Sequence, residues 1–558
     1  MFLRSKRSGR YEYLQLVHNT RVGRSVRQQV LATLGRLDQL RDSGQLDALI
    51  ASLSRFSHVS AVLGPNSRTA REGAETVRIG PALLFERLWE ESGIGGVLER
   101  LLLGRKFEFD VERAVFLTVL HRLFSPGSDR AAEHWRHGYR IGGTEALELH
   151  HLYRAMAWLG EPLEDREQID AAPFGPRTRK DQVEEALFAE RRDLFSGLDL
   201  VFFDTTSIYF EGAGGERLGQ FGHSKDHRPD RHQMVVGAVL DNHGRPICSE
   251  LWPGNTTDVT TLLPVVDRLR SRFALDELCI VADRGMVSAE TIAELQHEAR
   301  SCRYILGARM RSVKEIRDVV LADPGRFEEV YGPRDSRDDP APLQVKEVWV
   351  EDRRHIVCFN PERARKDQAD REAIVASLDE HLRRGPKSLV GNKGYRRYVK
   401  STGSSFAVDH DKVNDEARFD GLWVLRTDLD RPPAEVALKY KELWQVEDLF
   451  RSVKSVLHTR PIYHQRDATI RGHVFCSFLA LVLLHELDRR MQARGFAYEW
   501  ARLRDDLDAL EEIRLDAMGR DVLVRSAPQG AAGRALQAAG VALGPAVRFL
   551  EDETSLTT

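Results

Sequence analysis

The chain is poor in the features that mark secreted, membrane-spanning and zinc-bound proteins. It has five cysteines in 558 residues, and none forms a C-x-x-C pair. A disulfide framework or a cysteine zinc site is therefore not expected, and a reducing cytosol fits. The first residues lack the apolar stretch of a signal peptide. The longest apolar run, Val474 to Leu484, is too short to span a bilayer and predicts a buried helix.

Charge of one sign is also not in excess, because the net charge is −3. A hydrophobic content of 42% and a charged content of 30% are typical of a soluble globular protein. The distribution is uneven, since the first forty residues hold eight basic and two acidic side chains, a net +6. A solvated basic hairpin is one interpretation. Contact with a DNA backbone is the interpretation that we favour.

The chain is longer than one core usually holds, and its patterns divide it into six regions. We expect a basic amino-terminal arm that contacts DNA, with a helix near Asp47–Leu53 and a linker from Gly64 to Gly73, then a helical domain. A catalytic core follows in two parts around a β-rich insertion, with a helical tail at the end. The predicted boundaries are 1–75, 76–197, 198–315, 316–417 for the insertion, 418–500 and 501–558.

Residues 198–307 alternate short apolar runs with amphipathic segments. The order of predicted elements is strand, strand, strand, helix, strand, helix, strand. This is the order of the ribonuclease H-like fold, an α/β mixed sheet with flanking helices. Its first and fourth strands are neighbours, so Asp204 and Asp283, which follow those two strands, are expected side by side. The open ends of strands at such a point commonly hold sites.

A third carboxylate, Glu447, lies on a strongly patterned segment that predicts one helix from Pro433 to about His458. Tyr440, Glu447 and Lys454 are seven residues apart and would project in one row, which Arg451 would join. Such a face is usually solvated surface, but here the helix follows the fifth strand and the insertion, where the fold needs its third acid. Asp204, Asp283 and Glu447 are therefore the predicted catalytic and metal-binding trio. They would hold Mg²⁺, with Mn²⁺ as a substitute and two ions expected.

At these residues the chain resembles the DDE transposases of bacterial insertion sequences, above all the subgroup with a β-rich insertion in the catalytic core. The matching motifs are Phe-Phe-Asp-Thr-Thr-Ser around Asp204 and Val-Ala-Asp-Arg-Gly-Met around Asp283. A third motif is the signature Tyr, two residues, Arg, three residues, Glu, six residues, Lys. Its positions here are Tyr440, Leu443, Glu447 and Lys454, so Leu443 departs from the pattern.

The resemblance implies an enzyme that binds the inverted-repeat ends of an insertion sequence, nicks DNA and joins the 3′ end to target DNA. It also implies that the amino-terminal 200 residues, with the helical domain 76–197, bind the DNA ends. It implies DNA as the partner, a homodimer on DNA, no membrane, and a place in the bacterial cytoplasm with the nucleoid. Relatives of this subgroup form a DNA hairpin and hold a flipped base on an aromatic residue. Two alternatives stay open: a nuclease of the same fold without strand transfer, and a domesticated DNA-binding protein with an inactive site.

Side chains around the trio are expected to contact DNA. By the resemblance, Tyr440 and Lys454 would hold phosphates, with Arg451 in place of the missing signature arginine and Trp423 as the candidate for the flipped base. A core position is at least as plausible for Trp423, and a core position is favoured for Trp444. The remaining predicted contacts are Arg284, Lys225 and Arg228. Asn255 to Asp258 are expected to cap the following helix rather than to serve catalysis.

Overall fold

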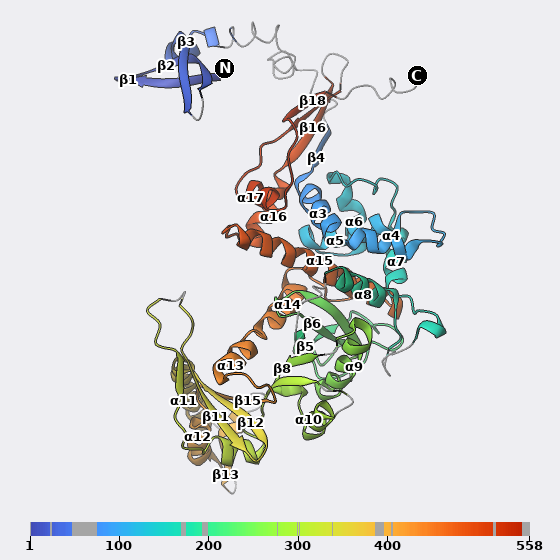
Figure 1. The fold of residues 1–558 in the computed structure, drawn as a ribbon, viewed down its shortest axis with the longest axis vertical. Helices are drawn as coiled ribbons and strands as arrows, with labels where there is room; N and C mark the ends of the chain where they lie inside the picture. Colours follow the sequence, from blue (N-terminus) through green and yellow to red (C-terminus); the bar gives the residue numbers. More distant parts are fainter. Residues whose placement is uncertain are drawn as a thin grey trace. The chain divides into compact units, whose positions relative to one another are not determined.

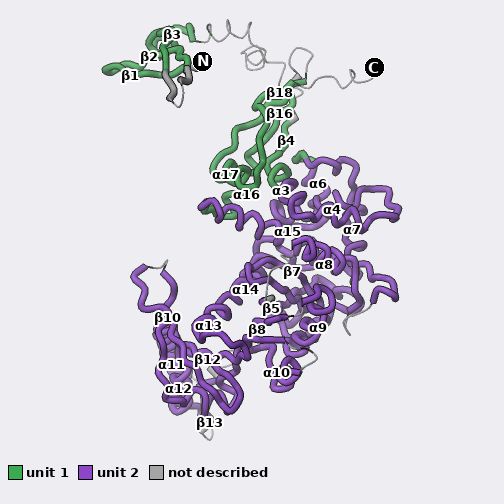
Figure 2. Tube along the Cα trace, in the orientation of Figure 1, with its two compact units in different colours: residues 1–84, 137–140, 497–558 green, residues 85–136, 141–496 purple. Residues whose placement is uncertain are grey.

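The computed structural model describes residues 2–22, 25–46, 49, 75–168, 175–191, 199–275, 277–297, 300, 302–336, 339–384, 395–402, 405–516 and 521–549 (Figure 1). The chain forms two compact units, one of residues 1–84, 137–140 and 497–558, the other of residues 85–136 and 141–496 (Figure 2). Apart from Leu49, the predicted helix near Asp47–Leu53 and the predicted linker from Gly64 to Gly73 lie outside the described residues.

The first unit contains the strands predicted for the amino-terminal arm. They are β1 (Phe2–Ser8), β2 (Tyr11–Val22) and β3 (Ser25–Arg36), which pair antiparallel in that order and are followed by α1 (Leu37–Asp42). The Arg36 guanidinium lies 3.7 Å from the centre of the Tyr11 ring and pairs with Asp38 at 2.5 Å. Arg4, Lys6 and Arg7 lie on β1 of this small sheet.

The carboxy-terminal residues of this unit are not the helical tail that the sequence predicts. They form α16 (Trp500–Asp508), β16 (Glu511–Asp516), β17 (Asp521–Arg525), α17 (Ala532–Ala538) and β18 (Val547–Phe549). With β4 (Glu75–Arg78) the strands make a sheet in the order β18-β17-β16-β4. In β16 the buried residue is Glu512, which accepts hydrogen bonds from Arg140 and Arg548.

The helices predicted before the catalytic core are present. They are α3 (Gly80–Glu91), α4 (Ile94–Leu102), α5 (Val111–Phe124), α6 (Asp129–Trp135), α7 (Leu149–Leu159) and α8 (Arg179–Arg191). The long helix α15 (Asp467–Ala493) contacts α5 and α7. It is long and apolar enough to cross a membrane, but 78% of its most apolar window is buried inside the molecule, as expected for a core helix.

The catalytic region has the strand order that the sequence predicts. Strands β5 (Asp199–Tyr209), β6 (Gln233–Leu240), β7 (Pro246–Pro253), β8 (Leu278–Ala282) and β9 (Arg303–Gly307) lie in the order β7-β6-β5-β8-β9. The first three pair antiparallel, whereas β5, β8 and β9 run parallel. Helices α9 (Leu262–Phe273) and α10 (Ala289–Gln296) pack on this sheet through one apolar cluster. This is the ribonuclease H-like arrangement.

The insertion extends this sheet, and its charged segment Pro361–Arg384 forms a helix. Its elements are β10 (Glu328–Tyr331), β11 (Leu343–Val350), β12 (Arg353–Phe359), α11 (Pro361–Arg384), β13 (Val399–Thr402), β14 (Ser405–Val408) and α12 (His410–Ala417). Strand β15 (Leu422–Thr427) then pairs with both β12 and β9, so that nine strands form one sheet. The insertion is therefore continuous with the core sheet, and α11 alone takes 24 residues of it.

The single helix predicted from Pro433 to about His458 is wrong. It is divided into α13 (Pro433–Lys441) and α14 (Trp444–Ser455). Between them the amides of Gln445 and Val446 bond to carbonyls three residues back, at 3.0 and 3.1 Å, which tightens the chain into a turn. Leu443 in this turn is only 6% exposed, so apolar burial accompanies the break. Tyr440 and Glu447 consequently lie on different helices.

Candidate active site

Two of the predicted acids lie side by side on neighbouring parallel strands. Strand β5 does not end at Asp204, as the sequence predicts, but continues to Tyr209, whereas Asp283 directly follows the last residue of β8. Phe203 of β5 is in register with Ala282 of β8. Asp204 directly follows Phe203, and Asp283 directly follows Ala282. The pKa of Asp204 is raised to about 6, chiefly by burial and also by the charges of Asp283 and Asp258, while Lys225 and the backbone amide of Thr205 oppose the rise. The pairing that the sequence predicts for these two aspartates is thus present in the sheet.

A further acid, Asp258, lies beside these two aspartates, and the expectation that it caps a helix is wrong. The cap position of α9 is Thr261, whereas Asp258 lies three residues earlier, in a short 3-10 turn. Its Oδ1 accepts a hydrogen bond from Thr205 Oγ1 at 2.7 Å, and its Oδ2 lies 3.1 Å from Lys225 Nζ. In sequence the segment precedes a helix and looks like a cap. Only the fold places the side chain beside the strand that carries Asp204.

Lys225 fastens the loop between β5 and β6 to this group of acids. Besides its ion pair with Asp258, its ammonium donates to the carbonyl and hydroxyl oxygens of Thr205, at 2.8 and 2.9 Å. Its backbone amide donates to Ser207 Oγ at 2.8 Å. In the described structure this predicted DNA contact therefore binds the protein, as a cation beside this group of acids.

Tyr440 lies against an aspartate of the pair. Its hydroxyl donates to Asp283 Oδ1 at 3.0 Å, and burial together with the charge of Asp283 raises the pKa of the phenol, so it stays protonated. Gly307 at the end of β9 makes this approach possible, because a Cβ there would fall 2.5 Å from the Tyr440 oxygen. The arrangement fixes the orientation of the Asp283 carboxylate.

The third predicted ligand, Glu447, is not joined to the two aspartates. It lies in the first turn of α14, which contacts β5 and β6, and its side chain is exposed. The carboxylate oxygens of Asp204, Asp283 and Glu447 do not all lie within 4.8 Å of one another. The structure thus brings two of the three acids together and presents the third on a helix packed against the strand of Asp204.

The remaining predicted contacts of the Glu447 helix differ in their surroundings. Lys454 is mostly buried and lies 2.7 Å from Asp226 Oδ1. Arg451 pairs with Asp448 on its own helix at 2.8 Å, and its side chain is 70% exposed. Trp444, expected in the core, is 60% exposed. That prediction is wrong because Trp444 starts α14 on the solvent side of the turn.

The predicted contacts elsewhere lie on three different segments. Arg228 pairs with Asp230 at 2.8 Å on the loop between β5 and β6, and Arg284 is exposed directly after Asp283. Trp423 is half-buried on β15, where it is in register with Cys358. None of these positions excludes a contact with DNA.

The carboxylates at this place fit a hard divalent cation. Asp204 and Asp283 supply oxygen ligands, and the pKa of Asp204 is raised because these charges are crowded and buried. Two other groups of potential ligands occur among the described residues, and their side chains are already bound within the protein. In one, Arg122 lies 2.9 Å from the Nδ1 of His473, which sits with His464 and Asp129. In the other, Arg154 binds Glu108 beside His150 and His151.

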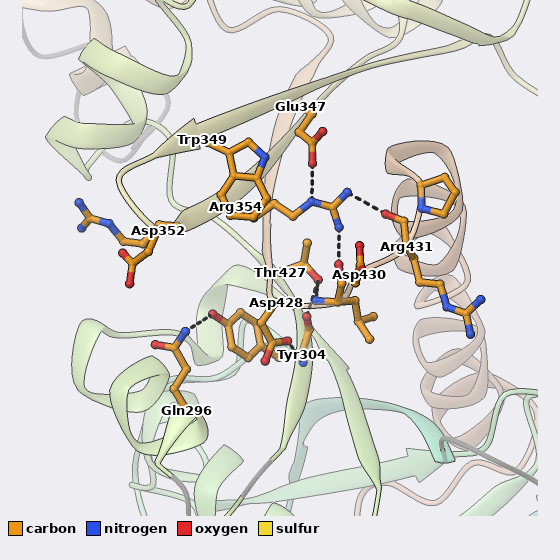
Figure 3. A pocket seen from close by; sticks show the side chains of 13 residues that line it. Gln296, Tyr304, Glu347, Trp349, Asp352, Arg354, Thr427, Asp428, Asp430 and Arg431 are labelled. Atoms are coloured by element: carbon orange, nitrogen blue, oxygen red, sulfur yellow. Dashed lines mark hydrogen bonds and ion pairs between the residues drawn. The ribbon is translucent and has the colours of Figure 1, made fainter.

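A separate cavity of about 550 Å³ lies where the insertion meets the core sheet (Figure 3). Arg354 crosses it and donates to Glu347 at 2.5 Å, to the carbonyl of Arg431 at 2.7 Å and to that of Leu429. The exposed indole of Trp349 borders it, and none of the three predicted acids lines it. Its polar contacts join the insertion to the segment after β15, which indicates a structural joint.

Comparison with known proteins places this geometry in a family. Residues 196–483 match the family model of the transposase DDE domain, and residues 3–61 match that of the IS1634 family transposase N-terminal domain. No curated protein matches the chain. One similar solved structure is the cryo-EM structure of a piggyBac transposase synaptic complex with hairpin DNA. It shares 11% identity over 77% of this chain and 79% of that one, with a TM-score of 0.38, too low for any argument from that complex.

The DDE domain match covers more than half of the chain and includes both aspartates and the helix of Glu447. Proteins of this family act on DNA and use divalent metal ions, typically Mg²⁺. The chain belongs to the DDE transposases of insertion sequences.

Proposed function

We propose that this protein binds the inverted-repeat ends of its insertion sequence, nicks them by metal-assisted hydrolysis, and joins the freed 3′ end to target DNA. The observation that supports this most is the Asp204–Asp283 pair on adjacent parallel strands, inside the region that matches the DDE domain. The proposal assigns Glu447 as the third acid, because its helix packs against the strand of Asp204. Two ends must be cut together, which favours a homodimer on DNA.

In this proposal Asp204, Asp283 and Glu447 hold two Mg²⁺ ions. When bound, such ions activate the attacking oxygen and stabilise the leaving oxygen of an in-line displacement. The protein side chains around them do the positioning. Tyr440 holds the Asp283 carboxylate in one orientation through its 3.0 Å hydrogen bond. Lys225 offsets part of the negative charge through Asp258.

The amino-terminal sheet would supply the first contact with the DNA end. Its side chains Lys6, Arg7 and Arg10 are exposed, and the segment matches the N-terminal domain of IS1634 family transposases. Replacing all three by alanine should weaken binding and flatten its salt dependence, because each lost phosphate contact removes about 0.9 from the slope of log K against log salt. An unchanged slope would remove the arm from the DNA interface.

The catalytic proposal is tested with duplexes that carry the element's end. The wild-type protein should nick the end only when Mg²⁺ or Mn²⁺ is added, and it should join a pre-cut 3′ end to a second duplex. Cleavage without joining would favour the alternative of a nuclease that lacks strand transfer. Binding without metal-dependent cleavage would favour the alternative of a domesticated protein with an inactive site.

A further inference from the structure

One buried carboxylate, Asp226, holds two cations beside the candidate active site. Its Oδ1 lies 2.7 Å from Lys454 Nζ and 2.5 Å from an Nη of Arg460. The Asp226 side chain is only 4% exposed, and its Oδ2 has no hydrogen-bond partner among the described residues. A single negative charge therefore faces two positive charges, which leaves the group with a net +1.

The two cations have hydrogen-bonding capacity to spare. An arginine carries five N–H donors and a lysine ammonium carries three. Within the described part of the chain, the ion pair with Asp226 is the only polar contact found for Arg460 or for the Lys454 ammonium. Both side chains are partly open to solvent, with 27% of Arg460 and 15% of Lys454 exposed. Such a pair suits a ligand that accepts several hydrogen bonds and carries negative charge.

The chain places this pair next to the group of acids at the candidate active site. Asp226 directly follows Lys225, which binds Asp258 and Thr205 beside Asp204. Two arginines, Arg228 and Arg460, contact the ring of Tyr209, which is on the same strand as Asp204. The guanidinium carbons of Arg228 and Arg460 are 5.3 and 5.7 Å from its centre. Arginine side chains therefore lie beside the end of the strand that carries Asp204.

We propose that Lys454 and Arg460 together bind one backbone phosphate of the DNA strand at the active site. The inference rests on the proposed function, which supplies the DNA, and it assigns a role to an arginine outside the signature motif. Leu443 at the signature's arginine position is buried, and Arg451 is occupied by Asp448 on the exposed side of α14. Arg460 is the arginine that shares a partner with Lys454.

The test measures the affinity of the full-length protein for a duplex carrying the element's end, between about 50 and 200 mM salt. Arg460→Ala should weaken binding and lower the salt slope by about 0.9, the value for one phosphate contact. Arg460→Gln should do the same while keeping a hydrogen bond to Asp226, and it decides the matter if the alanine variant does not fold. Arg460→Lys keeps the charge and should retain most of the slope.

Arg451→Ala is the matched control, because it removes an arginine from the position that the sequence predicts to replace the missing signature arginine. An unchanged slope for both Arg460→Ala and Arg460→Gln, in a protein that still binds and cleaves the end, would overturn the inference and leave the proposed function intact. A lower slope for Arg451→Ala alone would also overturn it. If the wild-type protein neither binds nor cleaves the end, the proposed function itself fails.

Discussion

The two halves of the candidate active site are built in different ways. The strand half holds Asp204 and Asp283 on adjacent parallel strands, with Asp258, Lys225 and Tyr440 bonded around them. The helix half presents Glu447 on the exposed side of α14, and no hydrogen bond or ion pair joins it to another described residue. One half is thus assembled before any ligand binds, whereas the other depends on what binds there.

The difference follows from where each half gets its stability. Residues of the sheet are fixed by ladder hydrogen bonds and by the apolar cluster packed against it, so burying an acid there costs free energy that the whole sheet offsets. A glutamate on a helix surface is held only by its own rotamer. A divalent ion, which attracts all three carboxylates, would join the halves.

The largest effect should come from removing a ligand from either half. Asp204→Asn, Asp283→Asn and Glu447→Gln should each slow end cleavage by at least ~10²-fold, because metal-based charge stabilisation amounts to several kcal/mol and each 1.36 kcal/mol is a factor of ten. Single-turnover cleavage with Mg²⁺ measures the loss, and binding to the end should stay largely intact as the control. If Glu447→Gln alone cleaves normally, the helix half has no part in the site.

The second expected effect is on thermal stability, and it distinguishes the two halves without a cleavage assay. The folded pKa of Asp204, about 6, lies above the unfolded value, so the folded state keeps a proton that the unfolded state loses. Stability from this group is present below about pH 4 and is lost as the pH rises through 6. The shift of about two units corresponds to ~3 kcal/mol. Asp204→Asn should therefore unfold at higher temperature than wild type at pH 8 in EDTA, with little difference at pH 4.

Glu447→Gln is the matched variant for this measurement. An exposed side chain away from special features changes stability by only about 0.5 kcal/mol, so its melting curve should follow wild type at both pH values. If Asp204→Asn and Glu447→Gln change the melting temperature equally in EDTA, the two halves of the site do not differ in stability as proposed.

A smaller effect should come from Tyr440→Phe, which removes the hydrogen bond to Asp283 and keeps the ring. Loss of an outer-shell partner typically costs 10–100-fold in metal affinity, and we expect about tenfold. Cleavage should then require more Mg²⁺, with a normal maximal rate at high Mg²⁺. Tyr463→Phe, at a side chain 65% exposed, is the control and should titrate like wild type. A loss that high Mg²⁺ does not restore would argue against an orienting role.

The strand half of the site was easier to predict from the sequence than the helix half. The aspartate pair was predictable because apolar runs mark strands and the order of elements implies which strands are neighbours, and β5 and β8 do pair. The break between α13 and α14 was not, because Leu443 fits a continuous helical stripe as well as a buried turn. The role of Asp258 and the sharing of Asp226 by Lys454 and Arg460 depend on loops meeting in space, which no spacing encodes.

The central claim is that acids 204, 283 and 447 form one metal site. Its most direct test is a crystal structure of the protein with Mn²⁺ and a DNA end, with the ions located by their anomalous scattering. The account predicts Mn²⁺ between Asp204 and Asp283, with the Glu447 carboxylate as an additional ligand. Manganese bound without Glu447, for example by the two aspartates and Asp258 alone, would contradict it.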